Sequence, residues 1–355
     1  MKKREIYIST INEKEKTPFF HNIIPVVFNV IFSKRLHQSA LYLFTLKNAY
    51  VSPYGIVFKN GKVINQSIYK SDNSKIWTNF LSFLNKIVKN KVRVIEGDCL
   101  VISHSWYQNY YHWLIEITPR LFLMKDDLVT KKLIIHKNIS KFHLEILSYF
   151  NFKEIIFIED DELLKCESVS FTSFPNFYLN QHLNIFTQSN KIIELNINTK
   201  LMKEMKLWFQ ENNPLLKESD KNKTNLYISR KKAGYRKILN ELDLEKMLDS
   251  NGFSKVFLED YSFNEQVMLL SNAKVVISIH GAGLSNTLFM QSKSHVVNLI
   301  SEHHHEFCYM TIADVAGVNY THINCKGEKL ENPAYNDITV DLNAVQQVFN
   351  SVNNL

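Results

Sequence analysis

From about residue 96 onward, short apolar runs alternate with longer segments that are apolar on one side only. Apolar runs at 100–102, 133–135 and 155–158 predict strands, and the segments 109–124 and 142–150 predict helices. The first 95 residues are irregular, with one clear hairpin signal at Asn60-Gly61 between two short apolar runs. Strands that alternate with helices favour a parallel sheet, so the fold class is α/β.

The alternation becomes more regular after a polar, charged stretch at 212–223, which we interpret as a linker. Five strands are predicted at 225–229, 255–258, 274–279, 295–300 and 320–324, and four helices at 241–248, 264–270, 284–290 and 307–315. This pattern is typical of a doubly wound, Rossmann-like domain. We therefore expect an N-terminal α/β domain over 1–210, with an irregular β-rich start, and a C-terminal Rossmann-like domain over 211–355.

Length and composition agree with two folded domains. The chain has 355 residues, of which 45% are hydrophobic and 22% charged. Its four cysteines form no C-x-x-C pair, so we expect no disulfide framework and a reducing, cytoplasmic setting. The apolar stretch 23–32 is too short to span a bilayer, and we interpret it as a buried element.

The basic residues give the first indication of a ligand. The formal net charge is +7, which permits binding to phosphates or to a membrane surface, but no nucleic-acid-binding motif is present. Only six of the 42 basic residues are Arg, and two of these, Arg230 and Arg236, follow a predicted strand together with Lys237. At the carboxyl end of a parallel strand, they are suited to hold a diphosphate. The alternative is a solvated charge run.

A glycine-containing turn follows the strand predicted at 274–279. His280, Gly281, Ala282 and Gly283 lead into a predicted helix that contains Asn286. Glycines let the backbone approach a ligand, and the start of a helix attracts an anion such as a diphosphate. The alternative is a tight turn without a ligand. Asn286 occupies the place of the third glycine of the dinucleotide fingerprint, which disfavours NAD.

The predicted helix 109–124 carries a candidate general base. His112, Glu116 and Arg120 are spaced at i, i+4 and i+8, so they share one face of an otherwise apolar helix. A carboxylate one turn from a histidine stabilises the imidazolium and fixes its tautomer. The alternative is a buried structural His-Glu pair on a helix that is kinked at Pro119.

In this order, these segments resemble glycosyltransferase family 61. The resemblance covers about 105–325 and rests on His112-Trp113, Glu116, Pro119-Arg120-Leu121, Ser229-Arg230, Arg236, Asn240-Glu241, the segment 262–267, the turn 280–286 and Phe289-Met290. It implies a GT-B architecture, with two Rossmann-like domains that face each other across a cleft. It also implies an inverting transfer from a nucleotide sugar, with a UDP-sugar favoured, and no metal or other cofactor.

The resemblance also implies roles and partners. His112 would be the base and Glu116 its partner, with Tyr111 and Arg120 on the acceptor side. The donor site would use the arginines, Lys237, the turn 280–283 and Asn286. By the logic of nucleotide-binding folds, Glu302, which follows the strand predicted at 295–300, would accept hydrogen bonds from the ribose. The acceptor would be an oligosaccharide or lipid-linked glycan of a bacterial capsule or lipopolysaccharide, reached in the cytoplasm or at the inner face of its membrane.

Three other functions compete with this one. The acidic run 159–162 would hold Mg²⁺ or Mn²⁺ in a metal-dependent transferase, although it has no clean D-x-D. A non-catalytic glycan-binding module would keep the fold without the base. An NAD-dependent sugar oxidoreductase is disfavoured by the missing third glycine. The run His303-His304-His305 resembles a metal box, but adjacent residues do not share a face, so we expect a loop.

Overall fold

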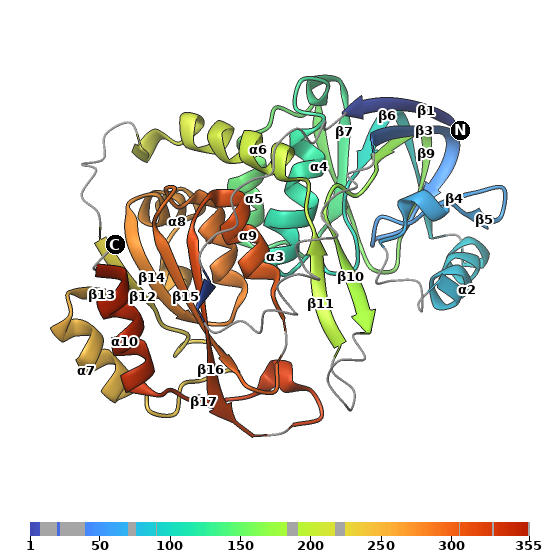
Figure 1. The fold of residues 1–355 in the computed structure, drawn as a ribbon. Helices are drawn as coiled ribbons and strands as arrows, with labels where there is room; N and C mark the ends of the chain where they lie inside the picture. The colour runs from blue at the N-terminus through green and yellow to red at the C-terminus, as the bar shows by residue number, and fades with distance from the viewer. Residues whose placement is uncertain are drawn as a thin grey trace. The chain divides into compact units, whose positions relative to one another are not determined.

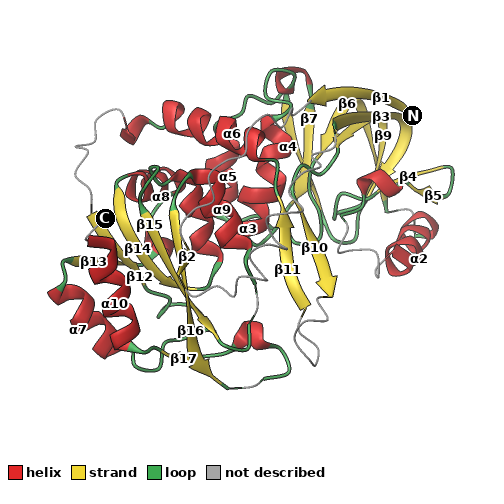
Figure 2. Ribbon diagram, viewed as in Figure 1, coloured by secondary structure: helices red, strands yellow, loops and turns green. Residues whose placement is uncertain are grey.

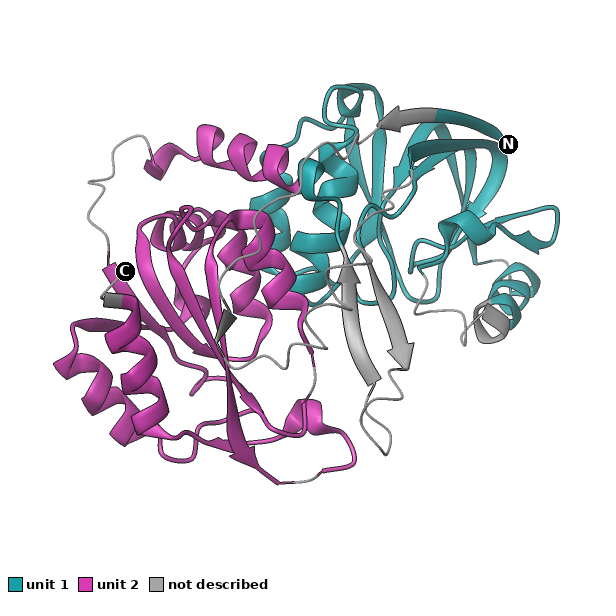
Figure 3. Ribbon diagram, viewed as in Figure 1, with its two compact units in different colours: residues 1–11, 37–178, 196–201 teal, residues 12–36, 179–195, 202–355 magenta. Residues whose placement is uncertain are grey.

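Figure 1 shows the computed structural model, which describes residues 1–7, 20–21, 40–69, 76–89, 91–182, 191–216, 224–304, 306–328 and 330–353. The chain divides into two compact units (Figure 3). Unit 1 comprises Met1–Ile11, His37–Tyr178 and Asn196–Leu201, and unit 2 comprises Asn12–Leu36, Leu179–Leu195 and Met202–Leu355. The apolar stretch predicted as a buried element at 23–32 lies outside the described residues.

The boundary between the units lies earlier than residue 210. Helix α6 (Thr199–Asn212) spans the predicted boundary, and most of it belongs to unit 2. The Gln210 amide donates to the carbonyl of Phe289 at 2.9 Å, and Lys206 donates to that of Met290 at 2.5 Å. The helix is held there by packing that no local sequence pattern reveals.

Unit 1 is built on an eight-stranded mixed sheet in the order β5-β4-β3-β9-β6-β7-β8, with β1 beside β3. The strands are β1 (Lys2–Tyr7), β3 (Leu41–Val51), β4 (Val57–Lys59), β5 (Lys62–Val63), β6 (Val92–Val101), β7 (Lys132–His136), β8 (Glu154–Ile158) and β9 (Leu163–Thr172). The predicted hairpin is confirmed as β4 and β5, with positive φ at Asn60 (49°) and Gly61 (69°), as a type I′ turn requires.

The chain reverses direction across the sheet of unit 1 at β6. From β6 it passes through α3 (Tyr110–His112) and α4 (Thr118–Phe122) to β7, and then through α5 (Lys141–Leu147) to β8. It then returns to β9 on the other side of β6, and β6 is parallel to both β7 and β9. The carboxyl ends of β6 and β9 therefore flank a topological switch point, where ligands of α/β sheets usually bind.

One further helix of unit 1 and a small separate sheet complete this part of the chain. They are α2 (Ile76–Val88) and a separate two-stranded sheet of β10 (Phe177–His182) and β11 (Lys191–Asn196). Within the described ranges, none of the helices combines the length and the apolar character that a membrane span requires.

Unit 2 contains the predicted doubly wound sheet (Figure 2), in the order β13-β12-β14-β15-β16-β17, with β2 beside β16. The strands are β2 (Phe20–His21), β12 (Thr224–Ile228), β13 (Phe253–Val256), β14 (Ala273–Ile279), β15 (His295–Ser301), β16 (Asn319–Gly327) and β17 (Ile338–Thr339). All neighbours are parallel except β17, which is antiparallel to β16. The α/β prediction is confirmed.

Helices cover both faces of this sheet. They are α7 (Glu241–Ser250), α8 (Phe263–Ser271), α9 (Cys308–Ala316) and α10 (Leu342–Asn353), with α7 and α10 on one face and α8 and α9 on the other (Figure 2). Leu244 of α7 and Val345 of α10 share a buried core with Ile277 and Leu299 of the sheet. The predicted helix 284–290 is instead a 3-10 helix, Ala282–Phe289.

The switch point of unit 2 lies between β12 and β14. The chain runs from β12 to β13 on one side and then crosses back to β14 on the other. The segment after β12 carries Arg230 and Arg236, and the segment after β14 carries His280 and Gly281. The fold thus brings the two predicted donor-binding segments to one place.

Candidate donor and catalytic sites

The helical segment that carries His112 is irregular where Pro119 and a side chain distant in the sequence meet it. Between α3 and α4 lies a π-helical turn, Trp113–Ile117. Pro119 has no N–H to donate to the carbonyl of Ile115, four residues earlier, and the side-chain amide of Asn176 donates to that carbonyl instead, at 2.5 Å. Such turns are frequent at functional sites.

Glu116 lies at the centre of a buried polar cluster. Its Oε2 accepts from His112 Nδ1 at 2.7 Å and lies 3.1 Å from His104 Nε2, while its Oε1 accepts from the Tyr69 hydroxyl at 2.5 Å. Burial opposes ionisation of Glu116, but the bonds from His104 and His112 outweigh it and hold its pKa below the ordinary value. The carboxylate is therefore ionised.

The two histidines of this cluster differ in their exposure. His104 Nδ1 accepts from the backbone N–H of Trp106 at 3.3 Å, so its proton is on Nε2, facing Glu116. Burial lowers the pKa of His104, which keeps it neutral. The His112 side chain is 15% exposed, against 1% for His104. His112 is therefore the imidazole that a substrate can approach, as a general base requires.

The two residues predicted on the acceptor side are buried in unit 1. Arg120 is 1% exposed, and its guanidinium donates to Ile102 O, to Thr172 Oγ1 at 3.0 Å and to Thr172 O at 3.1 Å. It therefore ties the ends of β6 and β9 together, and burial lowers its pKa to about 9. Tyr111 is 3% exposed. This geometry gives Arg120 a structural role and does not support acceptor contacts by either residue.

In unit 2, Arg230 and Arg236 converge on the turn after β14. Arg236 adopts a left-handed backbone conformation (φ 58°) and donates from Nη1 to the carbonyl of His280 at 2.8 Å. A Cβ at Gly281 would lie only 2.4 Å from Arg230 Nη1, so only glycine leaves room for this guanidinium. Burial, followed by the charge of Arg236, lowers the pKa of Arg230.

Neither guanidinium is neutralised by a carboxylate within the part of the chain that the structure describes. In that part, the Nε atoms of Arg230 and Arg236 are buried and have no hydrogen-bond partner. By contrast, Lys232 of the same loop pairs with Asp260. Two adjacent cations whose donors are not all used are suited to bind an anion.

His280 is placed beside this site but is not a cation. It is 2% exposed, its Nδ1 accepts from the Asn298 amide at 3.0 Å, and its Nε2 lies 3.3 Å from Glu306 Oε2. Burial lowers its pKa to about 4, so it is neutral near pH 7. His280 contacts the arginine pair through its backbone carbonyl, which accepts a hydrogen bond from Arg236.

The other predicted donor residues divide into packed and exposed ones. Asn286 is fully buried and donates to Gln266 at 2.9 Å, and a Cβ at Gly283 would lie 2.8 Å from Leu258 Cδ1. These two residues support the turn rather than a ligand, and Ala282 begins the 3-10 helix. Glu302 and Lys237 are exposed and follow β15 and β12, as predicted.

The residues that contact the predicted site residues were not predicted from the sequence. They are Tyr69 and His104 around Glu116, and Asn298, His304 and Glu306 around His280. His104 had a detectable signal, since it is a polar residue just after a buried strand. In the three-histidine run, His304 is buried and lies 3.2 Å from Glu306, His303 lies 3.9 Å from Glu302, and His305 lies outside the described residues.

The acidic run 159–162 is engaged with basic and aromatic side chains. Its members pair as Glu159 with Lys137, Asp160 with Tyr54 and His136, Asp161 with Lys91, and Glu162 with Arg93. Two other groups have ligand atoms close enough to hold a metal ion, namely His104, His112 and Glu116, and His280, His304 and Glu306. In each, the glutamate already lies within hydrogen-bond distance of both imidazoles.

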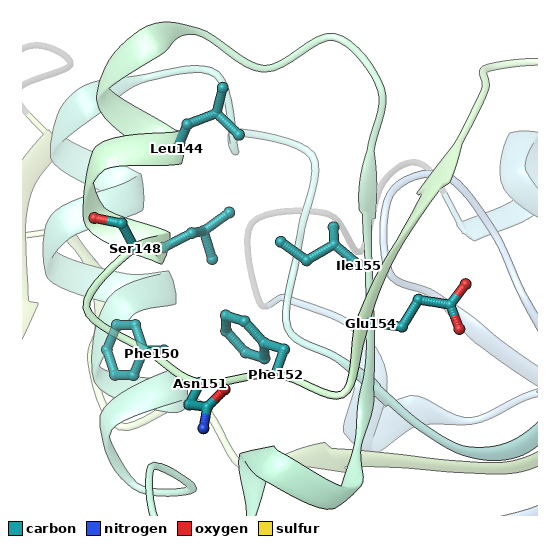
Figure 4. A pocket seen from close by; sticks show the side chains of 8 residues that line it. Leu144, Ser148, Phe150, Asn151, Phe152, Glu154 and Ile155 are labelled. Carbon is teal, nitrogen blue, oxygen red and sulfur yellow. The ribbon is translucent and has the colours of Figure 1, made fainter.

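Unit 1 also has a surface pocket. Figure 4 shows it between α5 and β8, where Leu144, Phe150, Phe152 and Ile155 line it. Its lining contains no predicted site residue, so we do not assign the donor or the acceptor to it.

Comparisons with known proteins agree with this geometry. Residues 110–297, more than half of the chain, match the sequence model of the family Glycosyltransferase 61. Over 103 residues the chain is 32% identical to the EGF domain-specific O-linked N-acetylglucosamine transferase of Gallus gallus, covering 28% of this chain and 19% of that protein. It is 34% identical to the protein O-linked-mannose beta-1,4-N-acetylglucosaminyltransferase 2 of Xenopus laevis, covering 27% and 18%. The match thus spans about a fifth of the length of these relatives. The chain belongs to glycosyltransferase family 61.

Proposed function

We propose that this chain is a glycosyltransferase that takes its sugar from a nucleoside-diphosphate sugar, by preference a UDP-sugar, and that unit 2 binds the diphosphate. One observation carries the proposal, namely the pair Arg230 and Arg236 at the switch point of the sheet, without a carboxylate partner among the described residues. Two fixed cations counter the charge that builds on a leaving diphosphate. The N-terminus of the 3-10 helix Ala282–Phe289 adds backbone N–H groups.

The acceptor hydroxyl would be activated by unit 1. Glu116, ionised and held by Tyr69 and His104, fixes the Nδ1–H tautomer of His112, which leaves Nε2 to accept a proton. As the acceptor oxygen forms its bond to the anomeric carbon, the bond to the diphosphate breaks, the hydroxyl proton passes to His112, and the configuration inverts. No step in this scheme uses a metal ion. A GT-B arrangement of the two units is part of the same proposal.

The relatives suggest which donor to test first. Both are named as N-acetylglucosamine transferases, so UDP-N-acetylglucosamine is the first candidate for this chain. Their names refer to EGF domains and to O-linked mannose, whereas the motif resemblance pointed to capsule or lipopolysaccharide glycans. Both kinds of glycan belong in the acceptor panel.

Titration calorimetry with UDP, GDP, TDP and CMP tests the donor site. Removal of a charged hydrogen-bonding group costs about 1.5–3 kcal/mol, so Arg230→Ala and Arg236→Ala should each raise the Kd of the best nucleotide roughly 10- to 100-fold. Arg236→Lys keeps the charge but loses the planar fork, and should bind with intermediate affinity. Lys232→Ala is the matched control, since Lys232 already pairs with Asp260. Unchanged affinity in both alanine variants would refute the phosphate assignment.

A further inference from the structure

Two exposed tyrosines lie beside the arginine pair of unit 2. Tyr235, on the loop that carries both arginines, is 41% exposed, and Tyr335, in the 3-10 helix Pro333–Tyr335, is 53% exposed. Their rings meet edge to face, with centroids 5.0 Å apart and planes at 70°. Tyr335 therefore packs against Tyr235, and Tyr235 remains partly exposed.

Tyr235 is also in contact with both cations. The Cζ atoms of Arg230 and Arg236 lie 5.7 Å and 5.1 Å from the centroid of its ring. Both distances are within the range of cation–π attraction. The ring thus has a fixed position relative to the groups to which we assign the diphosphate.

We infer that Tyr235, braced by Tyr335, is the platform on which the nucleobase of the donor stacks. The inference rests on the proposed function, because it requires a nucleotide whose phosphates lie on Arg230 and Arg236. Only a ribose separates the base of a nucleoside diphosphate from its α-phosphate. With the phosphates on the two guanidinium groups, the base reaches the ring that both groups touch.

The chemistry of the platform defines what it recognises. A phenol ring binds the flat face of any base, and such stacking contributes about 1–3 kcal/mol without strong base preference. Tyr235 therefore supplies affinity for nucleotides over free phosphates, whereas the choice among bases depends on groups at the base edge. A merely structural Tyr235, which shields the arginines, would affect nucleotides and free phosphates alike.

Calorimetry with two probes, UDP and inorganic pyrophosphate, separates these possibilities. The wild-type protein should bind UDP more tightly than pyrophosphate. Tyr235→Ala should weaken UDP binding about 5- to 100-fold and leave pyrophosphate binding within about twofold. Tyr235→Phe should retain the affinity for UDP, since the ring remains. Leu239→Ala, a 69% exposed residue of the same loop, is the matched control.

Each other outcome has a definite meaning. An equal loss of UDP and pyrophosphate affinity in Tyr235→Ala, or no loss at all, overturns the platform but leaves the phosphate site intact. Equal affinities of the wild-type protein for UDP and pyrophosphate would also overturn the platform and leave the phosphate site intact. If the wild-type protein binds neither probe, the proposed donor site itself is wrong, and the platform falls with it. Because Tyr235 is exposed, its truncation should not unfold the protein, and thermal melting of each variant checks this.

Discussion

Two imidazoles share the Oε2 atom of Glu116, and their surroundings give them different tasks. His104 is buried in unit 1 and carries its proton on Nε2, 3.1 Å from Glu116 Oε2. His112 is partly exposed and stacks on Trp106, which is itself 47% exposed. Of the two, only His112 combines a partner carboxylate with access for a substrate.

Replacing His112 by alanine should lower kcat by about 10²–10⁴, because a positioned general base contributes about that much. The affinity for the nucleotide should remain, since the arginines belong to unit 2. Glu116→Gln should cost less activity, because the imidazole survives with a weaker partner. Turnover, nucleotide affinity and melting temperature should be measured on the same preparations.

If the cluster is only structural, the same variants should behave differently. Loss of a buried partner costs about 1–3 kcal/mol of stability and more for a charged group, so the melting temperature would fall. A folded, donor-binding His112→Ala protein with wild-type turnover would rule out the catalytic role. Tyr69→Phe then separates the two roles further, since it removes only one hydrogen bond to Glu116.

His280 predicts a pH dependence of stability. Its pKa is lowered to about 4 in the folded protein, against about 6.5 in an unfolded chain. Between these values the unfolded chain binds the additional proton, so the free energy of unfolding falls as pH decreases from about 6.5 to about 4. The stabilising contribution of His280 is fully present above pH 6.5. His280 contributes at most about 3 kcal/mol to this loss.

Urea unfolding at several pH values measures this contribution. His280→Gln should show a shallower loss of stability between pH 6.5 and 4 than the wild-type protein. His303→Gln should follow the wild-type curve, because this partly exposed histidine has only a 3.9 Å contact with Glu302. Identical pH profiles for wild type and His280→Gln would contradict the assignment.

At the scale of elements, the parallel strands of unit 2 could be predicted from the sequence. A strand buried on both faces is a mostly apolar run, as in β14 and β15, where Ser278 and Asn298 interrupt the apolar residues. In contrast, β3 and β9 of unit 1 were missed. Their pairing joins segments about 120 residues apart, such as Leu43 and Thr172, and β9 carries Lys165 and Glu167. No local pattern shows such pairing.

Helix type was equally inaccessible to the sequence. The segment after Gly281 was predicted as an α-helix, but its buried residues include Ser285, Asn286 and Thr287, and it is wound as a 3-10 helix. The π-helical turn depends on Asn176, which reaches the carbonyl of Ile115 from 61 residues away. Such distortions depend on tertiary partners, which the pattern of apolar positions does not specify.

The candidate site was predictable where the residues are chemically rare. Arg230 and Arg236 stood out because arginine is scarce in this chain, and His112 because a carboxylate follows one turn later. Tyr69 did not stand out, since it is 47 residues from Glu116 and has no pattern of its own. Arg120 shares the predicted helix face with His112, but the spacing did not show that its guanidinium donates to the ends of two strands.

For the whole molecule, the layout of the two units is similar. Each has a parallel core with a switch point, and in each a glutamate lies within hydrogen-bond distance of two imidazoles near the carboxyl ends of strands. The arginine pair distinguishes unit 2 and the accessible imidazole distinguishes unit 1. This difference fits the proposal that unit 2 binds the donor and unit 1 accepts the proton.

Transfer should therefore continue in EDTA, because the arginines and the 3-10 helix already supply the charge that a metal ion would bring. Activity should be measured on metal-stripped protein with and without added Mn²⁺. Loss of activity in EDTA that Mn²⁺ restores would contradict this expectation. His304→Ala, in the group around Glu306, and Asp161→Asn, in the acidic run, would then show which residues hold the ion.

The pairing of β2 with β16 has a consequence for synthesis on the ribosome. Phe20 lies opposite Tyr320, so the partners are 300 positions apart (320 − 20). At about 5–20 residues per second, β16 emerges about 15–60 s after β2 has been made. The nascent chain must keep this early segment available while the rest of the sheet assembles. Although β2 is made first, it can therefore join the sheet of unit 2 only after β16 has been made.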